Sequence, residues 1–288
     1  MPSTDRLLHP DLLASIPFGE TLTGRLLERR VTEALADDPN ADPNVTVVVR
    51  TLNEAATLEL LLLDVRRQAF AAEVEIIVVD NESTDGTPDV AKQFGARVVS
   101  FPRHEFTYPR SMNLGMAAAS HDIVFLTVGH ARLSTVHSLH AGARHFRADD
   151  RVGGVFGTVL PNAGASWIES FAATIDTNRG LVRPAHRVRR TGQGVLGATG
   201  AMISKSVWEE LGRFDERYET GGEDTALAGL MLANGYEIVR EPALSVHHSH
   251  ALGLRDTVRQ LLHQRRTLRA PQRLNRTELL ERRPDLRV

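Results

Sequence analysis

The chain has 288 residues, a formal net charge of −2 and no cysteine. Without cysteine, disulfides and thiolate metal sites are excluded, so any metal ion would have to be held by His, Asp or Glu. No stretch approaches the roughly 20 apolar residues of a membrane-spanning helix, and residues 1–20 lack the apolar core of a signal peptide. We therefore expect a cytoplasmic protein with one large α/β domain or two small ones.

Apolar runs and helical periodicity alternate after an N-terminal extension. Residues 1–43 form this extension, which ends in the turn-rich segment DDPNADPN. Short apolar runs, rich in β-branched residues, predict buried strands at 45–50, 74–80, 97–100 and 122–127. Helical spacing predicts the intervening helices at 54–69, 88–94 and 109–119. This order is typical of an α/β fold with a Rossmann-like, doubly wound, mostly parallel sheet.

Polar residues follow three of the predicted strands. These residues are Arg50, Thr51, Asn53 and Glu54 after the first strand, Asp80 and Asn81 at the second, and Thr127 to His130 at the fourth. Because ligands bind beyond the carboxyl ends of parallel strands, we expect these side chains to gather along one rim. The alternative is local turn and cap chemistry, for which Asn53 and Asp80 are suitable residue types.

The end of the fourth strand lacks acidic residues. An enzyme that holds a divalent cation on nucleotide phosphates usually places paired carboxylates at such a position. This chain instead has Thr127, Val128 and Gly129, followed by His130.

Four segments together resemble family-2 glycosyltransferases, which have the GT-A fold. They are TVVVRTLNEAATLELLLLDVRRQ at 46–68, EIIVVDNESTDGT at 75–87, FTYPRSMNLGMAAASHDIVFL at 106–126, and the stretch from 197 to 239 that contains GGEDTALAGL. The resemblance covers roughly residues 45–250. It implies a nucleotide-sugar-binding half at 44–135, an acceptor-binding half of the same domain at 136–252, and a basic C-terminal helix and tail at 253–288. Most relatives carry Asp-x-Asp where this chain has Thr127 to Gly129.

The resemblance implies a donor site on the predicted rim. Asp80 would contact the base, and Thr51 and Glu54 would line the nucleoside pocket. The guanidinium groups of Arg50 and Arg110 suit base carbonyls or phosphate oxygens, with a surface ion pair as the alternative for Arg110. The predicted donor-binding residues are Arg50, Thr51, Asn53, Glu54, Asp80, Asn81, Arg110 and Asn113.

Inverting transfer needs a carboxylate that accepts the proton of the attacking hydroxyl. By match to the family's Glu-Asp pair, Asp224 is the predicted general base and Glu223 its neighbour in acceptor binding. The alternative is that both acids only cap the helix that begins there. A sugar-phosphate nucleotidyltransferase and an inactive relative that binds nucleotide sugars are the competing functions.

The segment VHHSHAL at 246–252 resembles the histidine-bearing segment that completes the metal site in many family members. It implies His130, His248 and His250 as ligands of a divalent cation, Mn²⁺ or Mg²⁺, and imidazole suits Mn²⁺ better than Mg²⁺. Two alternatives stay open. His130 contacts the donor diphosphate directly without a metal, or it is a structural residue.

The expected partners are a nucleoside-diphosphate sugar with UDP or GDP and an acceptor that is a small molecule, a glycan or a lipid-linked compound. The arginine-rich tail from Arg255 to Arg287 is either a solvated segment or a surface for phosphates and anionic lipids, which leaves peripheral membrane contact open. Aromatic residues are too sparse there to predict nucleic-acid binding. The segment 183–194 is predicted to be a mobile loop over the site, and an amphipathic helix at 254–266 leaves a homodimer open.

Overall fold

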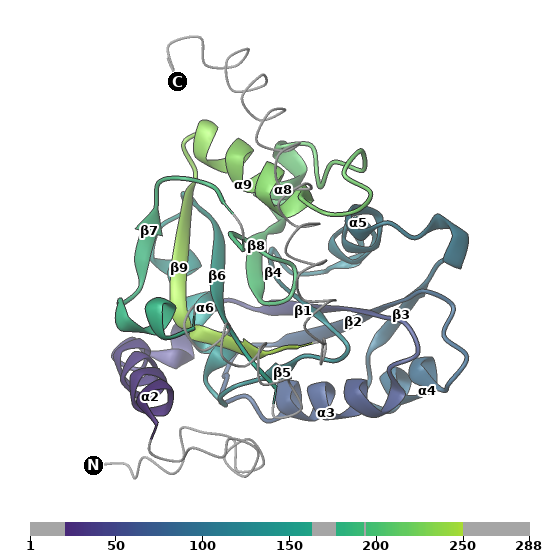
Figure 1. Cartoon of the computed structure of the whole chain (residues 1–288), viewed down its shortest axis with the longest axis horizontal. Helices are drawn as coiled ribbons and strands as arrows, with labels where there is room; N and C mark the ends of the chain where they lie inside the picture. The colour runs from purple at the N-terminus through teal and green to yellow at the C-terminus, as the bar shows by residue number, and fades with distance from the viewer. Residues whose placement is uncertain (1–20, 163–176, 193, 250–288) are drawn as a thin grey trace, which may run out of the picture.

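The computed structural model describes residues 21–162, 177–192 and 194–249. Across this part of the chain the strands form one nine-stranded sheet in the order β3-β2-β1-β4-β8-β6-β9-β5, and β7 pairs with β9 (Figure 1). The first elements are α2 (Leu22–Ala34), η2 (Pro39–Ala41), β1 (Val45–Thr51), α3 (Ala55–Arg66), β2 (Val74–Asp80), α4 (Thr87–Gln93), β3 (Arg97–Ser100), η3 (Arg103–Glu105), α5 (Tyr108–Ala118) and β4 (Ile123–Val128). The later elements are β5 (Arg132–Leu133), α6 (Ser138–Ala148), β6 (Val152–Leu160), β7 (His186–Val188), β8 (Ala201–Ser204), α8 (Lys205–Glu210), α9 (Glu223–Ala233) and β9 (Glu237–His247).

The first half of the sheet is parallel, as predicted. β1 lies between β2 and β4, with Thr51 opposite Asp80 and Arg50 opposite Val128. β3 continues the parallel order beyond β2. β1 is buried on both faces, which explains its nearly continuous run of valines. The four predicted strands and the three predicted helices of this half are confirmed.

The second half of the sheet is mixed. β8 runs antiparallel to β4 and β6, whereas β9 runs parallel to β6. The register of β6 shifts between Phe156 and Thr158, where a Cβ on Gly157 would lie 1.3 Å from the carbonyl oxygen of Leu244. Only glycine fits at this irregularity, and such irregularities bend a strand. The far end of β9 pairs with β5, which brings the residue after β9 close to the end of β4.

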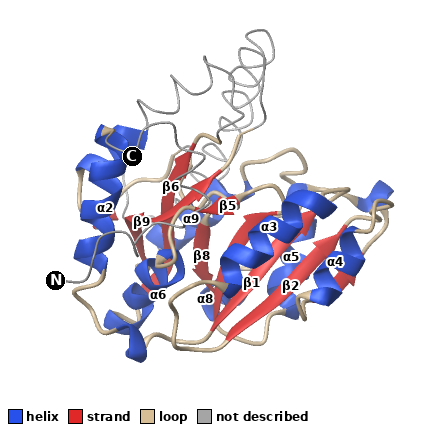
Figure 2. Cartoon of the chain, turned by 90° about the horizontal axis from the view of Figure 1, so that it is seen from below, coloured by secondary structure: helices blue, strands red, loops and turns tan. Residues whose placement is uncertain are grey.

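Helices cover both faces of the sheet (Figures 1 and 2). Val47 and Val49 of β1 pack in one core cluster with residues of α3, α4 and α6. Val48 points to the opposite face, into the cluster formed with α5, α8 and α9. A Cβ on Gly115 of α5 would lie 2.3 Å from Val48 Cγ1, so this glycine lets α5 lie against β1. Gly115 therefore serves helix packing.

The described part of the N-terminal extension, residues 21–43, contains a packed helix. Helix α2 begins after Thr21, whose side chain accepts a hydrogen bond from the backbone N–H of Gly24. Its buried face, with Leu27 and Val31, packs on α6 and β9. No helix in the described part of the chain is long and apolar enough to cross a membrane.

The segment 183–194 is not simply a loop. It contains β7, which pairs antiparallel with β9 from His186 opposite Arg240 to Val188 opposite Ile238. The prediction of a loop was therefore wrong for residues 186–188, because these residues pair with a distant strand. The predicted helix at 254–266, the arginine-rich tail and His250 lie outside the described residues.

Candidate active site

The predicted rim exists at the carboxyl ends of β1, β2 and β4. The backbone N–H of Asn81 donates to the carbonyl of Thr51 at 3.2 Å, and that of Gly129 donates to the carbonyl of Arg50 at 3.0 Å. These bonds join the three strand ends just beyond the regular ladder. The polar residues that follow the strands are therefore brought together, as the parallel order requires.

Asn53 ties the two loops of the rim together. It has a positive φ of 54°, a conformation that asparagine tolerates better than most residues. Its N–H donates to the Ser83 hydroxyl at 2.8 Å, and its side-chain oxygen accepts from the N–H of Thr84 at 2.8 Å. The backbone of Glu54 is held in the same way by the Thr87 hydroxyl, at 2.9 Å. Asn53 thus braces the loops that carry the other rim residues.

Asp80 and Asn81 have different surroundings. One carboxylate oxygen of Asp80 accepts from the N–H of Ser83 at 3.1 Å. The other oxygen is buried and has no hydrogen-bond partner among the described residues. Asn81 uses its side-chain N–H groups on the carbonyls of Phe101, at 3.2 Å, and Pro102, at 3.1 Å. Asp80 therefore retains an acceptor, while the Asn81 amide supports the next loop.

Glu54, His130 and His248 form a chain of polar contacts. Glu54 accepts from the Thr51 hydroxyl at 2.9 Å, and its other oxygen contacts Nδ1 of His130. Nε2 of His130 lies 2.9 Å from Nε2 of His248, with 4.8 Å between the ring centroids. Because a carboxylate only accepts, Nδ1 of His130 carries the hydrogen, and a neutral ring then presents its Nε2 lone pair toward His248.

Gly129 follows β4 at a position where a side chain would meet Glu54 and Thr51. A Cβ at this position would lie 2.4 Å from a carboxylate oxygen of Glu54 and 2.8 Å from the hydroxyl oxygen of Thr51. An aspartate at residue 129 would require Glu54 to move. The side chain of Thr127 is also engaged in a contact within the protein, because its hydroxyl donates to the carbonyl of Thr199 at 3.2 Å. The polar groups at this strand end therefore come from Glu54 and the two histidines.

Arg50 lies at the centre of the rim. Its guanidinium carbon lies 4.6 Å from the ring centroid of Tyr108 and 5.8 Å from that of Phe106. Burial lowers the pKa of Arg50 from its ordinary value, while Tyr108, Glu223 and Glu54 act in the opposite direction. The charge thus interacts both with Glu54 on the strand-end rim and with Glu223 of α9. The sequence analysis does not predict a role for this aromatic pair. Both aromatic residues belong to the stretch FTYPR, which lies in one of the segments that resemble the family.

Glu223 and Asp224 begin α9 after two glycines with positive φ, Gly221 and Gly222. Glu223 is buried, and its Oε2 atom has no hydrogen-bond partner among the described residues. Burial and the neighbouring Asp224 raise the pKa of Glu223 to about 7, while Arg50 acts to lower it. Burial also raises the pKa of Asp224, against the hydrogen bond from the Thr225 N–H at 2.6 Å. Both acids thus hold protons at higher pH than exposed carboxylates.

Arg110 and Asn113 of α5 are engaged elsewhere. Arg110 forms an ion pair with Glu105 and lies 3.8 Å from a Glu216 oxygen. The Asn113 amide donates to the carbonyl of Phe214 at 2.9 Å and accepts from the Phe214 N–H at 3.1 Å. These contacts attach α5 to the loop before α9. Neither side chain shares a direct contact with the strand-end cluster in the described structure.

Comparison with known proteins agrees with this architecture. The profile of glycosyl transferase family 2 matches residues 46–212. An O-antigen chain rhamnosyltransferase of Salmonella anatum is 25% identical over 213 residues, which are 72% of this chain and 67% of that protein. An uncharacterized glycosyltransferase of Mycobacterium tuberculosis is 41% identical over 80 residues, 28% of this chain and 34% of that protein.

Two solved structures illustrate the similarity in fold. A mannosyltransferase of Pyrobaculum calidifontis, in complex with GDP-Man and Mn²⁺, matches with a TM-score of 0.55 and 21% identity over 85% of this chain and 69% of that one. GalNAc-T7 with UDP, GalNAc and Mn²⁺ matches with a TM-score of 0.57 and 16% identity over 74% of this chain and 45% of that one. The fold is of the GT-A type, and the chain belongs to glycosyltransferase family 2.

Proposed function

We propose that this glycosyltransferase inverts the anomeric centre of a sugar that it transfers from a nucleoside diphosphate, UDP or GDP, to an acceptor hydroxyl. The observation that carries the proposal is the position of Arg50, whose partly buried charge interacts with Glu54 on the rim and with Glu223 on α9. One cation thus lies between the candidate donor site and the candidate acids. The similarity to GT-A structures that hold GDP-Man or UDP supports this choice of donor.

The donor is assigned to the rim. The free oxygen of Asp80 is suited to accept a hydrogen bond from a base N–H, because a buried acceptor without a partner is costly. Arg50 offers guanidinium N–H groups to the diphosphate, where charge-assisted hydrogen bonds are strong. Asn53, Asn81, Arg110 and Asn113 then act indirectly, by holding the loops and α5 in place. Thr51 acts through Glu54.

Two histidines fit a divalent cation on the diphosphate. In the described part of the chain, no group of three or more His, Asp or Glu side chains is arranged to hold a metal ion. His130 and His248 place two Nε2 atoms 2.9 Å apart, close to the roughly 3 Å between ligands at right angles about 2.1 Å from one cation. Glu54 orients His130 as carboxylates orient metal-bound histidines. The remaining ligands would be diphosphate oxygens and water.

A bound cation would offset the charge that develops on the leaving diphosphate. Mn²⁺ in two of the similar structures supports this assignment. Without a metal, Arg50 and a protonated His130 would carry that task alone.

Asp224 is assigned as the general base. Its carboxylate takes the proton of the acceptor hydroxyl while the acceptor oxygen bonds to the anomeric carbon. The bond from that carbon to the diphosphate oxygen breaks on the opposite face, so the configuration inverts. Glu223 is assigned to acceptor binding beside it. The raised pKa of Asp224 makes it a stronger base than an exposed aspartate.

Calorimetric titration with UDP and GDP tests the donor site. We expect one of the two nucleotides to bind, more tightly with Mn²⁺ than with EDTA, and Arg50→Ala to weaken binding. Arg29→Ala is the matched control, because Arg29 is an exposed arginine paired to Glu33 on α2. If neither nucleotide binds under any condition, the donor site and the proposed function are both wrong. Nucleotide binding without any release of the sugar would favour the inactive relative.

A further inference from the structure

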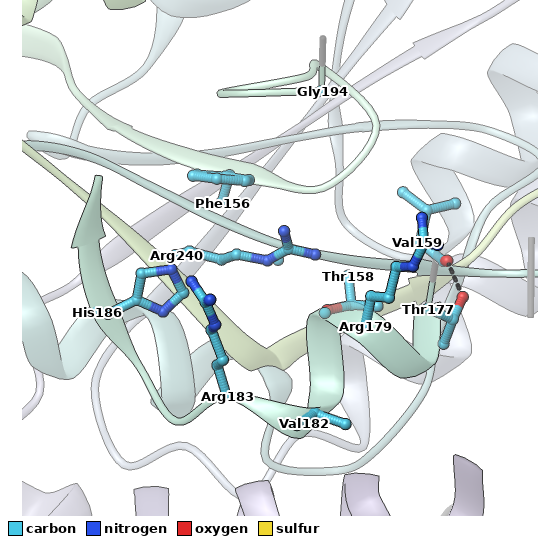
Figure 3. Close-up of a pocket in the computed structure, with 12 residues that line it drawn as sticks. Phe156, Thr158, Val159, Thr177, Arg179, Val182, Arg183, His186, Gly194 and Arg240 are labelled. Atoms are coloured by element: carbon cyan, nitrogen blue, oxygen red, sulfur yellow. Dashed lines mark hydrogen bonds between the residues drawn. The ribbon is translucent and has the colours of Figure 1, made fainter. Parts of the chain in front are cut away.

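The sheet holds the backbone of His248 in place. His248 follows β9 directly, and its N–H donates to the carbonyl of Leu160, the last residue of β6, at 2.9 Å. The parallel register of β6 and β9 places Leu160 opposite His247. The carbonyl of the neighbouring Val159 accepts from the Thr177 hydroxyl at 2.9 Å, which Figure 3 shows as a dashed line. A long strand and its neighbours thus fix the position of His248.

His130 receives less support from the sheet. It lies in the connection between β4 and β5, and β5 has only two residues, Arg132 and Leu133. Among the described strands, β5 pairs with β9 alone, and one further backbone bond joins Ser134 to Ser245 at 3.1 Å. This strand is shorter than most strands of globular proteins. Side-chain contacts therefore have a larger part in placing the connection that carries His130.

A buried ion pair fastens β5 to helix α3. Two guanidinium nitrogens of Arg132 donate to the two carboxylate oxygens of Asp64, and the distance from Nη2 to Oδ1 is 2.9 Å. The Asp64 side chain is 1% exposed and that of Arg132 is 20% exposed. Arg132 also stands opposite His247 in the pairing of β5 with β9. A contact through two parallel hydrogen bonds fixes the orientation of both groups, so it also determines where β5 lies.

The same helix contacts the chain on both sides of this ion pair. Glu54, which precedes α3, contacts Nδ1 of His130. Gln68, which follows α3, donates to the carbonyl of Thr135 at 2.9 Å and accepts from the N–H of Leu139 at 3.0 Å. The chain from 130 to 139 therefore follows α3 in order, from its first residues to its last.

We propose that Asp64 and Arg132 act as a positioning pair that holds His130 against His248. The inference rests on the proposed function, since these two histidines are the ligands assigned to the cation there. Asp64 and Arg132 are assigned no contact with the donor or the cation. They keep the two Nε2 atoms 2.9 Å apart before a ligand binds. A site that is ordered in advance binds more tightly, because less conformational freedom is lost on binding.

A second buried ion pair provides the matched control. Glu241 of β9 accepts from Nη2 of Arg144 at 2.7 Å, and their side chains are 2% and 15% exposed. This pair joins β9 to α6 and lies outside α3 and the chain from 130 to 139. Breaking a buried ion pair lowers stability wherever the pair lies. Glu241→Gln therefore reports the effect of lost stability alone.

NMR spectroscopy of the nucleotide-free protein tests the geometry without a metal. The ring centroids of His130 and His248 lie 4.8 Å apart, so we expect a nuclear Overhauser effect between their carbon-bound ring protons. The signals are assigned from those lost in His130→Ala and in His248→Ala. Asp64→Asn should abolish the effect, and so should Arg132→Lys, which keeps the charge but loses the two-point contact. Glu241→Gln should retain it.

Calorimetry tests the consequence for the cation. For the nucleotide that the wild-type enzyme binds, Asp64→Asn and Arg132→Lys should reduce the ratio of Kd in EDTA to Kd in Mn²⁺ by about tenfold, as expected for an outer-shell partner of a metal ligand. The Kd in EDTA should stay the same. A pair that only stabilises the fold would lower resistance to urea and leave this ratio at its wild-type value.

An unchanged Overhauser effect or full Mn²⁺ dependence in Asp64→Asn and Arg132→Lys would overturn the inference. Absence of the effect in the wild-type protein, or its equal loss in Glu241→Gln, would also overturn it. Arg132→Lys is the milder substitution, and a dispersed spectrum shows that a variant remains folded. A failure of the proposed function appears separately, as absent UDP and GDP binding, and leaves the NMR comparison intact.

Discussion

Nε2 of His130 and Nε2 of His248 lie 2.9 Å apart, although the two residues are 118 positions apart in the sequence. Pairing of β5 with the end of β9 brings them together. Two imidazole nitrogens that face each other need either a shared hydrogen or a shared cation. The proposed cation site follows from this pair and from Glu54, which fixes the tautomer of His130.

Replacing His130 by Ala should remove the metal dependence of nucleotide binding. We expect the increase in nucleotide affinity that Mn²⁺ causes to become smaller by about tenfold or more, while the affinity measured in EDTA stays the same. Calorimetry with the nucleotide that the wild-type enzyme binds measures both values. His104→Ala, at a side chain that is 81% exposed, is the control and should behave as wild type. If EDTA leaves nucleotide binding by the wild-type enzyme unchanged, the proposed cation site is contradicted.

Asp80→Asn should weaken nucleotide binding with little effect on folding. The amide keeps an oxygen for the Ser83 N–H, but it replaces a charged acceptor at the assigned base contact. Loss of a hydrogen bond to a charged group is worth about 1.5–3 kcal/mol, or roughly a tenfold to a hundredfold increase in Kd. Asp89→Asn, at a side chain that is 77% exposed, provides the comparison. Unchanged affinity in Asp80→Asn would remove Asp80 from the donor site.

Asp224→Asn should lower kcat by about a hundredfold to ten-thousandfold, since a general base contributes on this scale. Nucleotide affinity should stay close to wild type, because the substitution lies outside the donor rim. Glu223→Gln should reduce activity mainly by raising the KM for the acceptor. Rates near wild type in Asp224→Asn would rule out its role as base.

The pH profile follows from the raised pKa of Asp224. The base works only when deprotonated, so activity should rise with pH through that pKa and be lost below it. The acid limb of kcat/KM should therefore lie at higher pH than the value of about 4 for an ordinary aspartate. An acid limb at or below that value would show that the enzyme uses a different group or an unperturbed one.

Glu223 should make the folded protein less stable as pH rises. Its pKa is raised from 4.5 to about 7, so between these values the folded state binds more protons than the unfolded state, and the free energy of unfolding falls with pH. This contribution is fully lost above pH 7. Glu223→Gln should be more stable than wild type at pH 8, by up to about 3 kcal/mol, with little difference at pH 4. Urea unfolding of both proteins at pH 4 and pH 8 measures the difference in the free energy of unfolding. An equal difference at the two pH values would contradict the prediction.

Gly129→Ala should disturb the site through sterics alone. The added Cβ would displace the carboxylate of Glu54 and release His130, so we expect loss of the Mn²⁺-dependent part of nucleotide binding. Overpacking typically costs about 1–3 kcal/mol of stability. Gly24→Ala is the control, because a Cβ there meets nothing closer than 3.6 Å. Full Mn²⁺ dependence in Gly129→Ala would show that Glu54 does not orient His130.

The sequence by itself determined the parallel half of the fold. The valine-rich strand 45–51 and the helices beside it follow from local periodicity. A strand that is buried on both faces can be recognised because its consecutive residues are apolar. The convergence of Arg50, Asp80 and His130 followed as well, because parallel strands place their carboxyl ends on one edge. Family resemblance supplied the roles of Glu223 and Asp224, which stay proposals.

Tertiary structure decided which of these residues meet. The ion pair of Arg110 with Glu105, the attachment of Asn113 to Phe214 and the stacking of Tyr108 on Arg50 depend on contacts that no local pattern encodes. The strand at 186–188 forms because its backbone pairs with the edge of β9. The sequence of these residues does not by itself predict a strand.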